Sequence, residues 1–158
     1  MGIDARKPGE TFLEYRDRVI NKISPSFCGA KWYNATIWLG NGATTSCHHP
    51  PSHQIPLTDL ETSYKAIHNT TYKKAVRKQM LEGVRPKECD YCWKMENLGK
   101  DVISDRTHKS VIYTDQELLD AKDRLGATED VDLKTLEISF DAICNFACSY
   151  CNASFSTK

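Results

Sequence analysis

The distribution of its cysteines constrains this chain of 158 residues more than any other feature. Of seven cysteines, three lie close together near the C-terminus and four are scattered over the first 92 residues. The N-terminal segment is polar and lacks the apolar core of a signal peptide, so we expect a cytoplasmic protein. Thiols that cluster in a reducing compartment bind metal or carry out redox chemistry more often than they form disulfides. The sequence therefore predicts metal centres.

Charge and hydropathy argue against two classes of partner. The chain carries 21 basic and 21 acidic residues, so no net field draws it to nucleic acid or to an anionic membrane surface. It contains no apolar run that approaches the ~20 residues needed to span a bilayer. We therefore expect neither nucleic acid nor a membrane as a partner.

Hydrophobic periodicity and capping residues predict a mixed α/β fold. Pro8 suits the first turn of one helix, Thr70 and Gly83 suit the two ends of another, and the sequence TDQE from Thr114 is a capping box. The expected elements are helices over residues 8–23, 59–68, 71–82 and 114–125, a β-hairpin over 32–46 and a strand over 134–140.

The helix expected over 71–82 carries a basic cluster. We interpret this cluster as a solvated helix face, with a phosphate contact as the alternative. Its members are Lys73, Lys74, Arg77 and Lys78.

The compact cysteines, Cys144, Cys148 and Cys151, have the spacing C-x3-C-x2-C and directly follow the strand expected over 134–140. A structural zinc site uses four ligands, which usually arrive as paired knuckles, so three thiols at this spacing suit zinc poorly. They suit a cubane iron–sulfur cluster with one iron left open to an outside ligand. A zinc or purely structural cysteine site, completed by distant residues, is the alternative.

This stretch resembles the cluster-binding loop of the radical S-adenosyl-L-methionine (SAM) superfamily, in which C-x3-C-x-aromatic-C follows the first strand of a β/α barrel. Tyr150 occupies the aromatic position, one residue before Cys151. The resemblance implies that Cys144, Cys148 and Cys151 hold a 4Fe-4S cluster, that SAM binds the open iron, and that Tyr150 lies beside the adenine. It also implies an oxidoreductase that cleaves SAM to a 5′-deoxyadenosyl radical. Its partners would be an electron donor such as flavodoxin or ferredoxin and a substrate such as a peptide.

The scattered cysteines predict a second metal site. Cys89 and Cys92 form C-x2-C without the preceding strand that a thioredoxin-type redox pair requires, so a metal knuckle is the better interpretation. Cys28 and Cys47 lie beside expected turns, where they can complete a four-thiolate site. Structural zinc (Zn²⁺) is one occupant, and in that case a histidine could replace one thiolate: His48, His49 or His53.

The second site also has a family resemblance. The four-cysteine region resembles the auxiliary iron–sulfur region of SPASM and twitch radical SAM enzymes, and the segment RKQMLEGVRPKECDYCWKMEN resembles the N-terminal region of radical SAM proteins with a twitch domain. The resemblance implies an auxiliary iron–sulfur cluster at Cys28, Cys47, Cys89 and Cys92. The better-known auxiliary domains follow the barrel, whereas these cysteines precede it. The competing hypothesis is a small non-catalytic zinc module with structural cysteines.

We therefore expect three parts: an auxiliary metal-binding region over 1–110, a capped helix and linker over 111–133, and the start of a radical SAM barrel over 134–158. The later strands of such a barrel do not follow in this sequence. The resemblance accordingly predicts a truncated chain or one part of a split enzyme, and we expect the chain to be inactive by itself.

Overall fold

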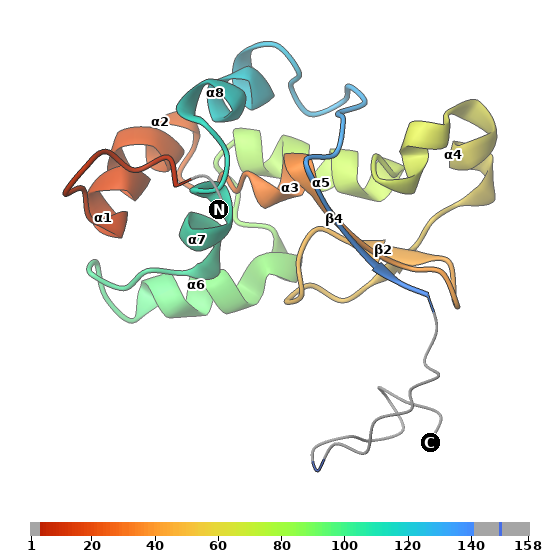
Figure 1. The fold of residues 1–158 in the computed structure, drawn as a ribbon, viewed down its shortest axis with the longest axis horizontal. Coiled ribbons are helices and arrows are strands. Elements are labelled where there is room, and N and C mark those ends of the chain that lie inside the picture. Colours follow the sequence, from red (N-terminus) through yellow and green to blue (C-terminus); the bar gives the residue numbers. More distant parts are fainter. Residues whose placement is uncertain (1–3, 141–148, 150–158) are drawn as a thin grey trace.

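The protein has a mixed α/β fold, seen in a computed structural model that describes residues 4–140 and residue 149 (Figure 1). The α/β class predicted from the sequence is confirmed, and residues 4–140 form no barrel. No helix among the described residues is both long and apolar enough to cross a membrane. The elements in order are α1 (Phe12–Tyr15), the π-helix η1 (Arg16–Ile20), α2 (Asn21–Ile23), α3 (Ala30–Tyr33), β1 (Asn34–Trp38), β2 (Ala43–Thr45), β3 (His53–Gln54), α4 (Leu57–Thr62), the 3₁₀-helix η2 (Tyr64–Ile67), α5 (Thr71–Leu81), the 3₁₀-helix η3 (Lys87–Cys89), α6 (Asp90–Asn97), α7 (Asp105–Ser110), α8 (Asp115–Asp123) and β4 (Thr135–Ser139).

The sheet has the strand order β3-β2-β1-β4. The hairpin predicted over 32–46 is confirmed as the antiparallel pair of β1 and β2. The strand predicted over 134–140 is also confirmed. It is β4, which pairs in parallel with β1 from Asn34↔Thr135 to Trp38↔Ser139. The crossover between these two strands contains all helices from α4 to α8, and in Figure 1 β4 passes over the hairpin.

The core joins segments from both halves of the chain. The helical stretch α1–η1–α2 supplies Tyr15 and Ile20, α5 supplies Met80, and α8 supplies Leu118. Trp32 from α3 lies at the centre and is fully buried. Within the first helical stretch, Tyr15, Val19, Ile20 and Ile23 recur at helical spacing, which is why periodicity predicted a helix there.

Helix ends follow the predicted capping chemistry at three places. Thr70 caps α5 and Gly83 follows it with a φ of 78°, a backbone conformation that glycine adopts without strain. The Thr114–Glu117 capping box is present at α8. At the first helix the prediction was wrong by several residues, because a second capping box at Thr11 starts α1 after a turn that contains Pro8.

The interpretation of the basic cluster on α5 as a solvated face is wrong for two of its four members. Lys73 and Arg77 are fully buried. Lys73 Nζ donates to the carbonyl oxygen of Asn34 at 3.0 Å, and Arg77 Nε donates to that of Lys31 at 3.0 Å. The physical reason is that α3 ends against α5, and its terminal carbonyl groups need donors that the helix itself does not supply. Sequence pattern alone does not show that requirement.

His68 lies against these two buried cations and gives the protein a pH-dependent stability. Its Nδ1 accepts from Lys73 Nζ at 2.7 Å, and its Nε2 donates to the carbonyl oxygen of Trp32 at 2.7 Å. Burial, together with the charges of Lys73 and Arg77, lowers the pKa of His68 to about 2. An unfolded histidine has a pKa near 6.5, so below that pH the unfolded chain binds more protons and gains stability relative to the fold.

We therefore expect acid to destabilise the protein partly through His68. Between pH 7 and pH 5 the free energy of unfolding should fall by about 2 kcal/mol more in the parent chain than in His68→Gln. Urea unfolding at the two pH values measures the difference within each variant. His108→Gln, at an exposed position, serves as the control and should retain the parent's pH dependence. An unchanged pH dependence in His68→Gln would contradict the assignment.

Candidate metal centre

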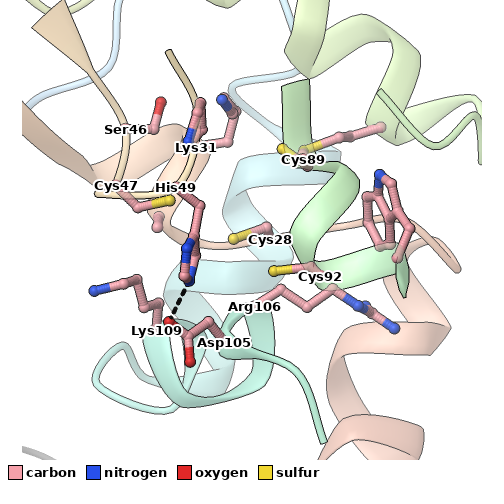
Figure 2. A pocket seen from close by; sticks show the side chains of 14 residues that line it. Cys28, Lys31, Ser46, Cys47, His49, Cys89, Cys92, Asp105, Arg106 and Lys109 are labelled. Atoms are coloured by element: carbon pink, nitrogen blue, oxygen red, sulfur yellow. Dashed lines mark hydrogen bonds and ion pairs between the residues drawn. The ribbon is translucent and has the colours of Figure 1, made fainter. Parts of the chain in front are cut away.

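Four cysteines from three separate segments of the sequence line one pocket (Figure 2). Cys28 precedes α3, Cys47 follows β2, Cys89 ends η3 and Cys92 lies on α6. All four are free thiols; Cys92 is buried and the others are half-buried. The structure thus brings together the four positions from which a second metal site was predicted, while the identity of any metal stays a prediction.

Gly29 holds Cys28 close to α7 and α8. Its amide donates to Ser110 Oγ at 2.9 Å. A Cβ atom at this position would lie 2.7 Å from Leu118 Cδ2 and 3.0 Å from Tyr113 Cδ2. Glycine therefore lets the backbone beside Cys28 lie close to these side chains, and a larger residue would require Leu118 to shift.

Local hydrogen bonds also hold the backbone at Cys47 and Cys89. Thr45 Oγ1 donates to the Cys47 carbonyl oxygen at 2.6 Å, which turns the chain after β2. The carbonyl oxygen of Pro86 accepts from the Cys89 amide at 3.1 Å and from Trp93 Nε1 at 2.8 Å. The C-x2-C segment therefore winds from η3 into α6 without the preceding strand of a thioredoxin-type pair.

The environment of Cys28, Cys89 and Cys92 favours the protonated form of their thiols. Burial, together with the three neighbouring thiols, raises the pKa of the Cys28 thiol to about 12. Burial likewise raises the pKa of Cys89 to about 12 and, by a smaller margin, that of Cys92. Binding of a metal as thiolate complexes would therefore release protons.

A buried cation lies beside the same pocket. Lys31 is 3% exposed and pairs with the carboxylate of Glu88. Burial lowers the pKa of Lys31, but nearby Cys89 and Glu88 outweigh this effect, so the pKa is raised overall. Lys31 is thus placed to balance negative charge that develops on the sulfurs.

The residues present fit a metal centre. Ser46 Oγ, at the pocket wall, is buried and has no hydrogen-bond partner among the described residues. Four thiols in one pocket fit either a four-iron cluster or a single tetrahedral zinc ion, because both take four thiolate ligands.

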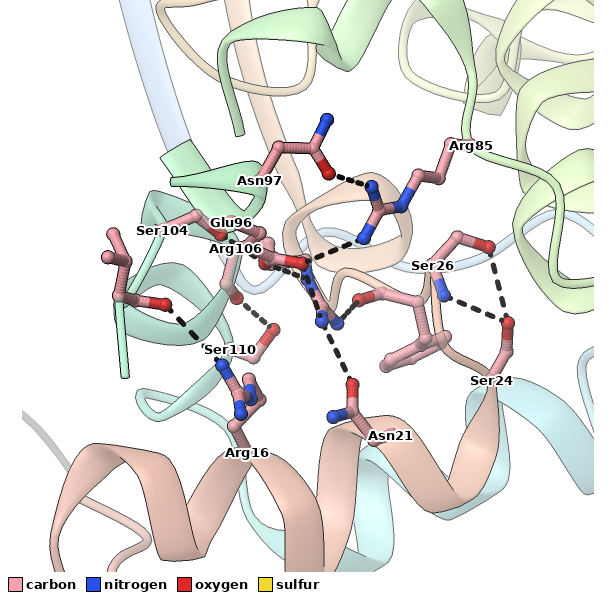
Figure 3. A network of polar contacts seen from close by, with 12 residues as sticks. Arg16, Asn21, Ser24, Ser26, Arg85, Glu96, Asn97, Ser104, Arg106 and Ser110 are labelled. Atoms are coloured by element: carbon pink, nitrogen blue, oxygen red, sulfur yellow. Dashed lines mark hydrogen bonds and ion pairs between the residues drawn. The ribbon is translucent and has the colours of Figure 1, made fainter. Parts of the chain in front are cut away.

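A buried polar network braces the wall formed by α6 and α7 (Figure 3). Arg106 is 3% exposed, and its Nε lies 2.5 Å from Glu96 Oε1. Its other nitrogens donate to the Phe27 carbonyl oxygen at 3.1 Å and to Asn21 Oδ1 at 2.9 Å. One side chain thus connects the segment before Cys28 with the helices that carry Cys92 and Asp105.

The pocket also contains residues that the sequence analysis missed. Asp105 accepts from His49 Nε2 at 2.7 Å, and His48 Nε2 lies 3.4 Å from the same oxygen. The two histidines were considered only as substitutes for a thiolate, and Asp105 was not considered because α7 was not predicted. Ser104 immediately before Asp105, a residue type that commonly precedes helices, was the available signal.

The compact cysteines Cys144, Cys148 and Cys151, together with Tyr150, lie outside the described residues. Their predicted role in binding a 4Fe-4S cluster and SAM therefore stays a prediction. Comparisons with models of known protein families, with curated proteins and with solved structures find no match for the chain.

Proposed function

We propose that this chain is an iron–sulfur protein of the radical SAM type. In this proposal Cys28, Cys47, Cys89 and Cys92 hold an auxiliary cluster, and the C-x3-C-x2-C segment holds the cluster that binds SAM. When bound, the cluster at the C-x3-C-x2-C segment would supply the electron that cleaves SAM to a 5′-deoxyadenosyl radical for hydrogen abstraction. The proposal implies that the protein functions as an oxidoreductase. Its substrate would be a peptide, and its electron donor would be of the flavodoxin or ferredoxin type.

The observation that carries the proposal is the convergence of four free thiols from three separate segments on one pocket. Four thiolates are the ligand set of a four-iron cluster. The buried Lys31 supports the same reading, because a cluster with four thiolate ligands is negatively charged and needs compensation. β4 supports the second half of the proposal, since it is a parallel strand that ends directly before the compact cysteines.

Anaerobic reconstitution of the chain with iron and sulfide tests the proposal. We expect about eight irons per chain, which corresponds to two four-iron clusters, and a brown protein whose reduced form gives electron paramagnetic resonance signals. Changing Cys28 and Cys89 to Ser should lower the iron content to about four, and changing Cys144 and Cys148 to Ser should do the same. Each pair is the matched control for the other, because each removes two thiols from one group.

Three other results would overturn the proposal or part of it. A colourless protein that is purified anaerobically with stoichiometric zinc and no iron would support the alternative, a non-catalytic zinc module. An iron content that is lowered by neither pair of substitutions would exclude both clusters. If only one of the two variants loses iron, only the cysteine group replaced in that variant holds a cluster.

A further inference from the structure

We propose that His48, His49 and Asp105 form a further metal site, in addition to the cysteine sites, for a divalent transition ion such as Zn²⁺, Co²⁺ or Fe²⁺. Their ligand atoms all lie within 4.8 Å of one another. Within residues 4–140 and 149 no other such group of three occurs among the histidine, cysteine and acidic side chains. Two imidazoles and a carboxylate suit these ions and leave further positions for water or another ligand.

The distances are close to those of a bound ion. Metal–ligand bonds of about 2.1 Å place neighbouring tetrahedral ligand atoms about 3.4 Å apart. His48 Nε2 and Asp105 Oδ2 are 3.4 Å apart already. His49 Nε2 and the same oxygen are 2.7 Å apart in a hydrogen bond, so an ion would replace the shared proton and widen this contact by about 0.7 Å.

Neighbouring side chains hold two of the three ligands in place. The His49 ring stacks on Tyr91 with 3.9 Å between ring centroids and an interplanar angle of 17°. Asp105 directly precedes Arg106, which is anchored on Glu96. The third ligand, His48, lies over the His49 ring at a centroid distance of 4.0 Å and has a side chain that is 60% exposed. The site is therefore supported from within and open to solvent on one side.

The location gives the site a structural consequence. His48 follows Cys47 directly, while His49 and Asp105 line the thiol pocket (Figure 2). An ion held by the triad would tie the loop after β2 to α7. Occupancy of this site is expected to restrain the loop that presents Cys47, even though no sulfur coordinates the ion.

Titration of the full, anaerobic chain with Co²⁺ tests the proposal independently of the iron–sulfur assignment. We expect about one Co²⁺ to bind with the weak visible absorption of nitrogen and oxygen ligation, separate from any cobalt that binds the thiols and gives intense near-ultraviolet bands. His48→Ala should weaken this binding at least about tenfold, and Asp105→Asn should act in the same direction. His108→Ala, an exposed histidine on the same helix as Asp105, should bind as the parent does.

The exposure of His48 makes its replacement compatible with folding, which far-ultraviolet circular dichroism checks. Equal Co²⁺ affinity in the parent and in His48→Ala would overturn the proposal. So would cobalt that shows only thiolate bands, since it would then occupy the cysteine pocket alone. Failure of the iron reconstitution leaves this result unaffected, because the two sites share no ligand.

Discussion

Replacing Arg106 with alanine is expected to lower the free energy of unfolding by about 3 to 5 kcal/mol. The guanidinium group is buried and satisfies Glu96, Asn21 and the Phe27 carbonyl oxygen at once. Its removal leaves the Glu96 carboxylate, 7% exposed, without its principal partner. Arg85 cannot compensate, since its nearest nitrogen lies 3.7 Å from Glu96. Urea unfolding followed by circular dichroism measures the loss.

The comparison that isolates burial is Arg124→Ala. Arg124 pairs with Asp120 at 2.9 Å, but its side chain is 71% exposed, so its removal should cost about 0.5 kcal/mol or less. A double replacement of Arg106 and Glu96 by methionine should recover much of the stability lost in Arg106→Ala, because it removes both buried charges. Equal losses for Arg106→Ala and Arg124→Ala would show that the network contributes no more than a surface pair. Because Arg106 braces the pocket wall, we also expect Arg106→Ala to retain less iron.

Trp32→Ala is expected to lower the free energy of unfolding by about 3 to 5 kcal/mol through a different mechanism, the loss of core packing. Trp32 is fully buried, and its ring centroid lies 4.8 Å from that of Phe27. The indole Nε1 donates to the Gly126 carbonyl oxygen at 2.8 Å, which attaches the end of the α8 segment to the core. The substitution would leave a cavity and an unsatisfied acceptor.

Tyr64→Ala provides the aromatic control, because Tyr64 is 80% exposed and its removal opens no cavity. This variant should lie within about 0.5 kcal/mol of the parent. The stability loss for Trp32→Phe should lie between those for Trp32→Ala and Tyr64→Ala, since phenylalanine keeps most of the packing but loses the hydrogen bond to Gly126. A loss for Trp32→Ala no greater than that for Tyr64→Ala would contradict the placement of Trp32 in the core. Thermal or urea unfolding distinguishes these outcomes.

Local patterns predicted the elements that depend on local physics. The capping box at Thr114 and the Thr70–Gly83 pair located α8 and α5, because a cap satisfies backbone groups a few residues away in the sequence. The hairpin and the strand over 134–140 were likewise visible as alternating or β-branched segments. By contrast, the short helix α7 was missed because six residues give too weak a period to recognise.

The burial of Lys73 and Arg77 is a feature that local sequence patterns did not predict. Basic residues on a helix are usually solvated, so sequence alone favoured an exposed face. Their environment is set by the carbonyl groups of Lys31 in α3 and of Asn34 directly after it, which lie some 40 residues earlier in the chain. The acceptors become visible only after the two segments pack together.

The candidate metal centre divides in the same way. The sequence by itself determined that Cys28, Cys47, Cys89 and Cys92 were a set, because cysteine types and spacings indicate ligand chemistry without coordinates. Only the tertiary structure decided that they line one pocket, that Lys31 lies buried beside them, and that Asp105 meets two histidines there. The physical reason is that thiol and imidazole chemistry belong to single residues, whereas burial and ligand distance arise from contacts between segments far apart in the chain.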